Sequence, residues 1–281
     1  MITEEQRKDR INYIGGSDLP IIMGLSKYKT PYALFLEKKG LQETPYDETP
    51  LQYWGNRLES VVREEFSIRN NVQVEEPETL AHPFHTFLRA NVDGYIPEWD
   101  AILEVKCSSA WMQAEWGEPG SDIIPMAYLV QVAHYCIVTN ASCAHIAVLL
   151  GGNDYREYKY TRDANLEAMV LKAATDFWSA VQNDDAPPAV NKDDLLLMYP
   201  RQEEGKSITI NPSIGGELTM LGVHKKTIKE HEKEEERHKF NVMQFMQDAE
   251  TLLGEDGKPV VTWKANKKGS RVFSLKGQKD E

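Results

Sequence analysis

The segment ANVDGYIPEWDAILEVK, residues 90–106, contains two short apolar runs separated by the turn-forming residues PEWD. Short apolar runs on either side of such a turn are typical of paired β-strands. The sequence therefore predicts two strands of one sheet, over residues 90–96 and 101–106, joined as a hairpin.

The second of these strands carries an acid and a base on one face. Side chains alternate along a strand, so Glu104 and Lys106 project to one side, while Leu103 and Val105 face the core on the other. Asp93, across the hairpin, can bring its carboxylate to the same place. Two carboxylates and a backbone carbonyl leave positions open for water and phosphate oxygens, which is how Mg²⁺ is usually held. Lys106 could orient or deprotonate an attacking water. Burial would lower the pKa of Lys106, whereas the nearby carboxylates would raise it, and the sequence leaves both outcomes open.

A plainer interpretation is an ordinary hairpin with a surface pair between Glu104 and Lys106. Two observations favour a site instead. An acid and a base beside a second acid are a poor way to build a core. Glu59, next to the apolar stripe of a helix predicted over residues 54–68, offers a third carboxylate. Gln131, on the helix predicted after the hairpin, could equally be a glutamine at the edge of the core.

Helical and strand patterns alternate through the rest of the first 186 residues. Further helices are predicted over residues 30–40, 125–135 and 165–181, and further strands over 143–150 and 155–161. This order predicts an α/β or α+β fold, with a central mixed β-sheet flanked by helices.

Composition excludes several classes of protein. The 281 residues are 41% hydrophobic, enough to bury a core, which rules out global disorder. The chain has no long apolar run and no signal-peptide pattern at its start, so we expect a soluble, cytosolic protein. Three cysteines without CxxC spacing exclude a disulfide framework and a four-thiolate metal cluster. The net charge of −12 repels nucleic acid, so binding to DNA would require positive charge concentrated locally.

The sequence DDAPP at residues 184–188 is typical of a domain boundary. We therefore predict one domain over residues 1–186 and a C-terminal extension over residues 187–281. The extension contains a helical pattern over residues 216–253 whose middle, residues 225–239, is almost wholly charged. Such a helix projects from a core or pairs weakly with a partner.

Three histidines recur every seven residues within this helix. They are His224, His231 and His238. Residues seven apart lie on separate turns and cannot share one coordination sphere, so a solvated helix face explains them better than a stripe of metal ligands.

The extension ends in a predicted basic hairpin, with strands over residues 258–264 and 270–275. Residues 257–281 contain seven basic and two acidic side chains, although the whole chain is acidic. A basic tail of this kind can simply be solvated, so the asymmetry alone does not indicate a partner.

Five motifs occur in order between residues 10 and 182. They are Gly15-Gly16-Ser17-Asp18, Trp54-Gly55-x-x-Leu58-Glu59, Asn91-x-Asp93-Gly94, Leu103-Glu104-Val105-Lys106 and Tyr128-x-x-Gln131-x-x-x-Tyr135. In this order they resemble the YqaJ-type viral recombinases, the lambda-exonuclease-like phage alkaline nucleases of the PD-(D/E)xK superfamily. The resemblance implies a restriction-endonuclease-like PD-(D/E)xK core over residues 1–186, with a C-terminal helical and hairpin extension.

The resemblance further implies a Mg²⁺-dependent deoxyribonuclease that degrades linear double-stranded DNA from 5′ to 3′ and leaves a 3′ single strand. Asp93 and Glu104 would ligate Mg²⁺ together with the carbonyl of Val105. Glu59 would complete a site for two ions, with Mn²⁺ as a substitute. Lys106 would position or activate the attacking water.

A second set of residues is implied to contact DNA. Arg10 and Ser17 stand where lambda-type enzymes receive the 5′-phosphate of the degraded strand, and Gln131 matches the glutamine that follows the catalytic strand. Asn91 departs from the pattern, because it stands where a serine helps to hold the phosphate; asparagine can also donate a hydrogen bond. Independently of the resemblance, Ser17 as the N-cap of a short helix would place free N–H groups where an anion can bind.

The resemblance also implies partners and a setting. Expected partners are double-stranded DNA ends, further copies of the chain in a homo-oligomer, with a trimer favoured, and a single-strand annealing protein of a phage recombination module. No membrane is involved. A phage- or prophage-encoded enzyme of this kind would work in the cytoplasm of its bacterial host.

Two other functions stay open at this point. An endonuclease or structure-specific nickase could use the same metal site, because the entry of the substrate rather than the chemistry separates it from an exonuclease. A non-catalytic DNA-end-binding scaffold is the second alternative. A scaffold needs none of the four charged residues just assigned, so their joint presence argues against it. The three scattered cysteines exclude iron–sulfur relatives.

Overall fold

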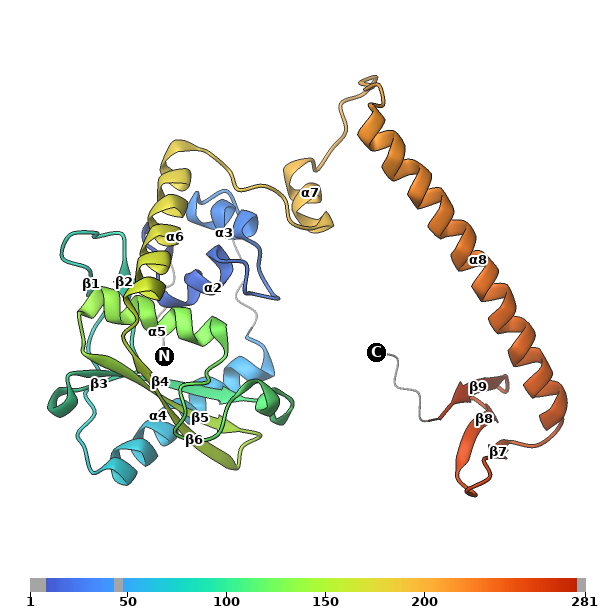
Figure 1. Ribbon diagram of the computed structural model, residues 1–281, viewed down its shortest axis with the longest axis horizontal. Coiled ribbons are helices and arrows are strands. Elements are labelled where there is room, and N and C mark those ends of the chain that lie inside the picture. Colours follow the sequence, from blue (N-terminus) through green and yellow to red (C-terminus); the bar gives the residue numbers. More distant parts are fainter. Residues whose placement is uncertain (1–8, 43–47, 277–281) are drawn as a thin grey trace. The chain divides into compact units, whose positions relative to one another are not determined.

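The computed structural model of the chain describes residues 9–42 and 48–276 (Figure 1). Contacts divide the chain into two compact units, Met1–Arg201 and Gln202–Glu281. None of the helices in these described stretches is long and apolar enough to span a membrane.

A four-stranded sheet in the order β3-β4-β5-β6 forms the centre of the first unit. Its strands are β3 (Gly94–Ile96), β4 (Ala101–Ser108), β5 (Cys143–Leu150) and β6 (Asp154–Thr161). The outer pairs β3–β4 and β5–β6 are antiparallel, and the central pair β4–β5 is parallel. The sheet is therefore mixed, as predicted. A separate two-stranded sheet joins β1 (Leu80–Ala81) to β2 (Arg89–Ala90).

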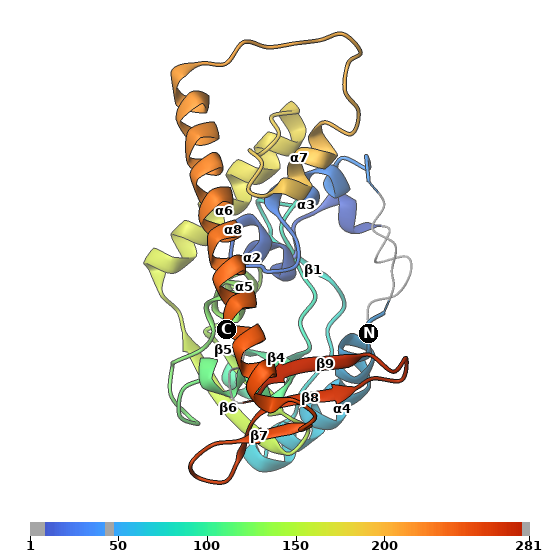
Figure 2. The ribbon, with the colours of Figure 1, turned by 90° about the vertical axis from the view of Figure 1, so that its right-hand side faces the viewer.

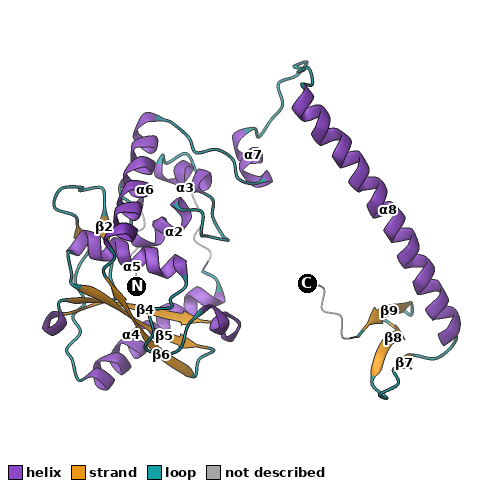
Figure 3. Ribbon diagram, in the orientation of Figure 1, coloured by secondary structure: helices purple, strands orange, loops and turns teal. Residues whose placement is uncertain are grey.

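Helices cover both faces of the central sheet, and Figure 3 shows the two layers around it. The longer helices of the unit are α3 (Pro31–Lys38), α4 (Pro50–Asn70), α5 (Met126–Thr139), α6 (Ala164–Asn183) and α7 (Lys192–Met198). On one face, Phe66 of α4 packs in a buried cluster with Leu103 and Val105 of β4. On the other, Ile102 of β4 joins a larger cluster with residues of α5 and α6. The predicted fold, a mixed sheet flanked by helices, is confirmed.

The first unit continues past the DDAPP sequence through α7. Asp194 of α7 is buried, and its carboxylate accepts a hydrogen bond of 2.6 Å from Thr30, at the start of α3. The backbone N–H of Val190 donates to the same carboxylate over 2.9 Å. These bonds hold the chain near α3 beyond the domain boundary expected after residue 186, and that boundary stays a prediction.

One strand prediction is wrong in its extent. The strand expected over residues 90–96 is interrupted, because β2 ends at Ala90 and β3 begins at Gly94. The intervening residues make no strand pairing. Instead, the Asp93 carboxylate accepts the backbone N–H of Val105 over 2.7 Å, so a side chain takes the place of a neighbouring strand.

The second unit consists of the 35-residue helix α8 (Pro212–Met246) and a three-stranded antiparallel sheet, both visible in Figure 2. The strands are β7 (Thr251–Leu253), β8 (Pro259–Ala265) and β9 (Arg271–Leu275). The helix predicted over residues 216–253 therefore ends seven residues early. Gln247 adopts a positive φ of 49° and turns the chain towards β7, although residues 223–253 contain no glycine or proline.

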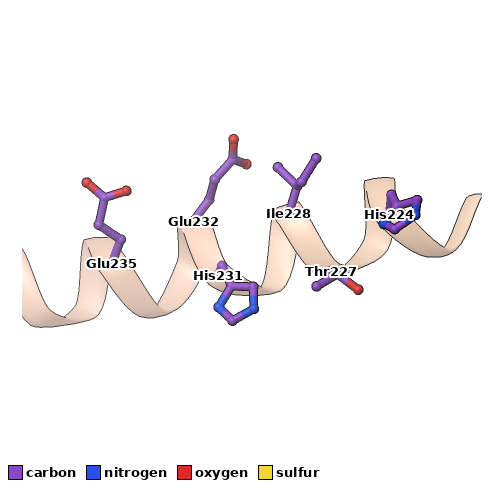
Figure 4. Close-up of a pocket in the computed structure, with 6 residues that line it drawn as sticks. All are labelled: His224, Thr227, Ile228, His231, Glu232 and Glu235. Atoms are coloured by element: carbon purple, nitrogen blue, oxygen red, sulfur yellow. The ribbon is translucent and has the colours of Figure 1, made fainter. Parts of the chain in front are cut away.

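The histidines of α8 lie on an exposed helix face. Figure 4 shows His231 and Thr227 on one side of the helix and Glu232 and Glu235 on the other, with His224 further along it. Seven residues along a helix correspond to about 10 Å, too far for two side chains to share one ion. No group of three His, Cys, Asp or Glu side chains in the described part of the chain is arranged to hold a metal.

Substitution of Gly94 tests the packing around β3, because its position leaves no room for a side chain. A Cβ at Gly94 would overlap Val74 Cγ1 and lie 3.3 Å from Leu103 Cβ. We expect Gly94→Ala to lower the free energy of unfolding by about 1–3 kcal/mol. Gly55→Ala is the control, because a Cβ there meets no atom within 4 Å and should stabilise α4 by about 0.5–1 kcal/mol. Urea unfolding measures both, and equal stability of the two variants would contradict this packing.

The buried His134 on α5 should make the stability of the protein depend on pH. Its Nε2 donates to Arg89 O over 2.9 Å, and burial lowers the pKa of its imidazole from 6.5 to about 4. Between these pH values, His134 is therefore protonated in the unfolded chain and neutral in the folded chain. The contribution of neutral His134 to the free energy of unfolding is fully present above pH 6.5. It is lost as the pH falls through about 4, at a cost of about 3 kcal/mol.

The comparison of wild type with His134→Gln isolates this effect, because glutamine keeps a donor for Arg89 O but does not titrate. We expect the unfolding free energy of the variant to fall less steeply on acidification, as measured by urea unfolding between pH 7.5 and pH 4. Parallel curves for the two proteins would show that His134 is protonated in the fold.

Candidate active site

A cavity of about 610 Å³ in the first unit collects the residues that the sequence singled out. Those that line it are Arg10, Ser17, Glu59, Asn91, Asp93, Glu104, Val105, Lys106 and Gln131. They come from five separate segments of the chain, so only the fold brings them together.

The cavity lies along an edge of β4 that β3 leaves unpaired. The register of the two strands ends with Gly94 opposite Leu103, because β3 has only three residues. Beyond that point, Asp93 Oδ2 accepts the N–H of Val105. Arg63 of α4 fixes the same segment from its other side, since Nη1 donates to the carbonyl of Asp93 over 2.8 Å. The Asp93 carboxylate is thus held against β4 at the place where the sheet is open.

Glu104 is the most buried of the acidic residues in the cavity, with 1% of its surface exposed. Its Oε1 accepts hydrogen bonds from Lys106 Nζ and, over 2.8 Å, from Gln131 Nε2. Gln131 Nε2 also lies 2.8 Å from the hydroxyl of Tyr135. The other oxygen, Oε2, is buried without a hydrogen-bond partner among the described residues. A buried carboxylate oxygen without a donor costs free energy, and a bound cation would relieve this cost.

The charges of the site act on one another. Burial, and next the charge of Glu104, raises the pKa of Asp93 to about 7. Burial acts to lower the pKa of Lys106, but the charges of Glu104 and Asp93 outweigh it and raise that pKa above its usual range. The two carboxylates therefore affect the pKa of Lys106 more than burial does, and Lys106 is a cation at neutral pH.

These residues fit a divalent cation. Asp93 and Glu104 repel one another, and Glu104 Oε2 lacks a donor in the described part of the chain, so a positive ion between the two carboxylates would stabilise both. The donors are carboxylate oxygens, with the carbonyl of Val105 nearby, and Mg²⁺ takes few protein ligands of this type. The described residues do not hold a ready-made cluster of three acidic, histidine or cysteine ligands.

Glu59 reaches the same cavity from α4. Burial, and next the charge of Asp93, raises the pKa of Glu59. Arg63, one helical turn later, lies 3.5 Å from Glu59 and 2.5 Å from Glu76. Sequence reasoning missed Arg63, although its spacing of four residues from Glu59 on a helix was an available signal.

Ser17 does not have the role of an N-cap. It lies in a 3₁₀ turn, Gly16–Asp18, and the following helix α2 (Leu19–Ile22) begins without a side-chain cap. Instead, its hydroxyl accepts a hydrogen bond from Arg10 Nη2. The predicted N-cap role of Ser17 is therefore wrong, and anion binding by the backbone N–H groups of this turn stays a prediction. Arg10 and Ser17 still lie together at the cavity, and their contact with a 5′-phosphate stays a prediction.

A buried ion pair holds this end of the cavity. Lys38 Nζ, on a fully buried side chain, donates to Asp18 Oδ2 over 2.7 Å and to the carbonyls of Arg10 and Tyr13 over 2.7 and 2.6 Å. Asp18 in turn accepts the N–H of Gly15 over 2.9 Å. Sequence reasoning missed Lys38, because a lysine in the last turn of a helix usually faces solvent.

Asn91 lies at the cavity wall between two fixed side chains. Its Nδ2 donates to the hydroxyl of Tyr13 over 3.3 Å, and its Oδ1 accepts the hydroxyl of Thr79 over 2.5 Å. These bonds orient the amide of Asn91, and its contact with a phosphate stays a prediction.

Comparisons with known proteins agree with the motifs. The YqaJ-like viral recombinase domain matches residues 5–142. The uncharacterized protein YqaJ of Bacillus subtilis (strain 168) is 33% identical over 272 residues, which are 94% of this chain and 84% of that protein.

Solved structures show a similar fold. An alkaline exonuclease, LHK-Exo from Laribacter hongkongensis, has a TM-score of 0.54 at 18% identity, covering 65% of this chain and 94% of that one. The same enzyme in complex with dAMP has a TM-score of 0.53 at the same identity and coverage. At this identity the likeness shows the fold alone. The identity and coverage of the Bacillus protein, with the domain match, show that this chain belongs to the family of the YqaJ-like viral recombinase domain, as its five motifs predicted.

Proposed function

We propose that the protein is a Mg²⁺-dependent deoxyribonuclease with a PD-(D/E)xK active site. The observation that supports this function is the convergence of Asp93, Glu104 and Lys106 at the open edge of β4, inside a cavity of about 610 Å³. Two buried acids beside a cation are costly unless the arrangement serves chemistry on a charged substrate.

Asp93, Glu104 and the carbonyl of Val105 would hold Mg²⁺, and Glu59, which lines the same cavity, would supply a ligand for a second ion. A bound Mg²⁺ would supply positive charge to the scissile phosphate and make the attacking water easier to deprotonate. Mn²⁺, which also prefers oxygen ligands, would substitute for it.

The other residues of the site have positioning roles in this proposal. Gln131 donates to Glu104 Oε1 and so leaves Oε2 for the metal. Lys106 would orient the attacking water or the phosphate by donating hydrogen bonds. The two carboxylates raise its pKa above its usual range, and a bound Mg²⁺ would oppose that effect. Arg63 keeps Asp93 in place through its carbonyl.

An exonuclease that proceeds from 5′ to 3′ on linear duplex DNA and leaves a 3′ single strand is the proposed form of this activity. The fold is that of an alkaline exonuclease, and that enzyme has been crystallised with dAMP, a nucleoside monophosphate. Arg10 and Ser17 lie in the same cavity as the carboxylates, and they would receive the 5′-phosphate there.

Family membership supports further proposals about assembly and setting. A homo-oligomer, with a trimer favoured, would enclose the DNA, and the 3′ strand would pass to a single-strand annealing protein of the recombination module. This chemistry belongs in the cytoplasm of a bacterial host. Light scattering tests the assembly, and a stable monomer at working concentration would reject an enclosing ring.

Lys106→Ala tests the proposed function. We expect the wild type to digest 5′-phosphorylated linear duplex with Mg²⁺ and to stop when EDTA is added. The variant should lose about 10²–10⁴ in kcat, because a positioned donor at the reacting phosphate is missing. Lys159→Ala, which removes an exposed strand lysine outside the cavity, is the matched control and should keep full activity.

Labels at the 5′ or the 3′ end report the polarity, and a supercoiled plasmid reports endonuclease activity. Circular dichroism confirms that both variants are folded. Undiminished digestion by Lys106→Ala would refute the assignment of the site, whereas rapid cutting of the plasmid would favour the endonuclease.

A further inference from the structure

The net negative charge of the protein comes from one of its two units. Residues 1–201 contain 18 basic and 30 acidic side chains, whereas residues 202–281 contain 14 of each. The first unit, which carries the candidate active site, therefore accounts for the whole net charge of −12. Such a unit repels a polyanion at long range, so a nuclease built on it needs positive charge from elsewhere.

Positive charge is concentrated in the sheet of the second unit. Residues 257–276 contain six basic side chains and no acidic one. They are Lys258, Lys264, Lys267, Lys268, Arg271 and Lys276. The basic residue Lys279, counted with the predicted tail, lies outside the described residues.

One face of this sheet is fixed to the end of α8 by Arg271. The guanidinium donates to the carbonyls of Gln247 and Ala249 over 2.7 and 2.6 Å. It also lies 3.6 Å from the ring centroid of Trp263 and donates to the carbonyl of that residue over 3.0 Å. Arg271 thus has a structural role, and it lies on the same face as Trp263, bonded to the segment that follows α8.

The opposite face carries a row of hydroxyl groups and a lysine, beside the exposed Val260 and Val272. Strand register places Thr262 between Thr251 and Ser274, which gives one row of three hydroxyl groups across the sheet. Lys264, two residues along β8 from Thr262, projects on the same side. Its Nζ lies 3.2 Å from Glu250, and 53% of the side chain is exposed.

The turn between β8 and β9 presents two more lysines. Asn266 closes it, because its side-chain oxygen accepts the N–H groups of Lys268 and Ser270 over 2.8 and 3.2 Å. Lys267 and Lys268 are exposed at the tip. Neither of them lies within ion-pair distance of a carboxylate in the part of the chain that the structure describes.

We propose that this sheet is a second DNA-binding site, in which the hydroxyl row, Lys264 and the two turn lysines contact the phosphate backbone of duplex DNA. Hydroxyl and ammonium donors bind phosphate oxygens without reading the sequence. The proposal rests on the proposed function only in that it takes DNA as the substrate. The sheet would hold the enzyme on DNA while the acidic unit cleaves it.

A triple variant, Lys264→Gln, Lys267→Gln and Lys268→Gln in the full chain, tests the site. The probe is a fluorescent blunt duplex in EDTA, so that no cleavage occurs, and anisotropy gives Kd between about 50 and 200 mM salt. We expect Kd to rise about 10- to 100-fold. The slope of log Kd against log salt concentration should fall by about 2–3, because each lost phosphate contact lowers this slope by about 0.9. The corresponding arginine variants should bind like the wild type.

The matched control removes the same charge from α8, through Lys225→Gln, Lys226→Gln and Lys229→Gln, all of which are exposed. Its Kd should change less than about threefold. Equal losses in the two triple variants would assign the effect to net charge and overturn the proposal, as would an unchanged Kd in the sheet variant. If the sheet variant loses affinity while the wild type digests no DNA, the proposed activity fails and the binding site stands.

Discussion

The open edge of β4 is the constraint on which the site depends. β3 stops pairing at Gly94, and the Asp93 carboxylate then accepts the N–H of Val105 that a longer strand would have used. This bond satisfies a backbone group and at the same time fixes a carboxylate next to Glu104. A continuous strand would have bonded Val105 through its backbone and left no carboxylate there. The irregular segment before β3 is therefore required by the site.

The core of the site could be predicted from sequence because its geometry is local. Alternation along one strand is enough to place Glu104 and Lys106 on one face, and the two residues do form an ion pair. The same reasoning extended the preceding strand through Asn91 and Asp93 and was wrong. A strand pattern describes side-chain period and cannot show that a carboxylate will replace a strand.

The residues that sequence reasoning missed act over long separations. Lys38 meets Asp18 across 20 positions, and Arg63 meets the carbonyl of Asp93 across 30. Neither partner is implied by local spacing, because each contact exists only after the helices dock. Burying the Asp18–Lys38 pair is costly unless both groups are fully bonded, and here Lys38 has three acceptors. Such a pair specifies one arrangement of the N-terminal segment beside the cavity.

With the proposed function, the division of charge would give the two units different physical tasks. A site that collects carboxylates for a cation raises the negative potential around it, which opposes the approach of the phosphate that it must cleave. Adding lysines to the cavity would neutralise this potential but would also compete with the metal for Glu104 and Asp93. Positive charge on a separate sheet, fixed through Arg271 to a 35-residue helix, avoids that competition. Binding and cleavage can then depend on different residues, so salt would weaken the first without altering the second.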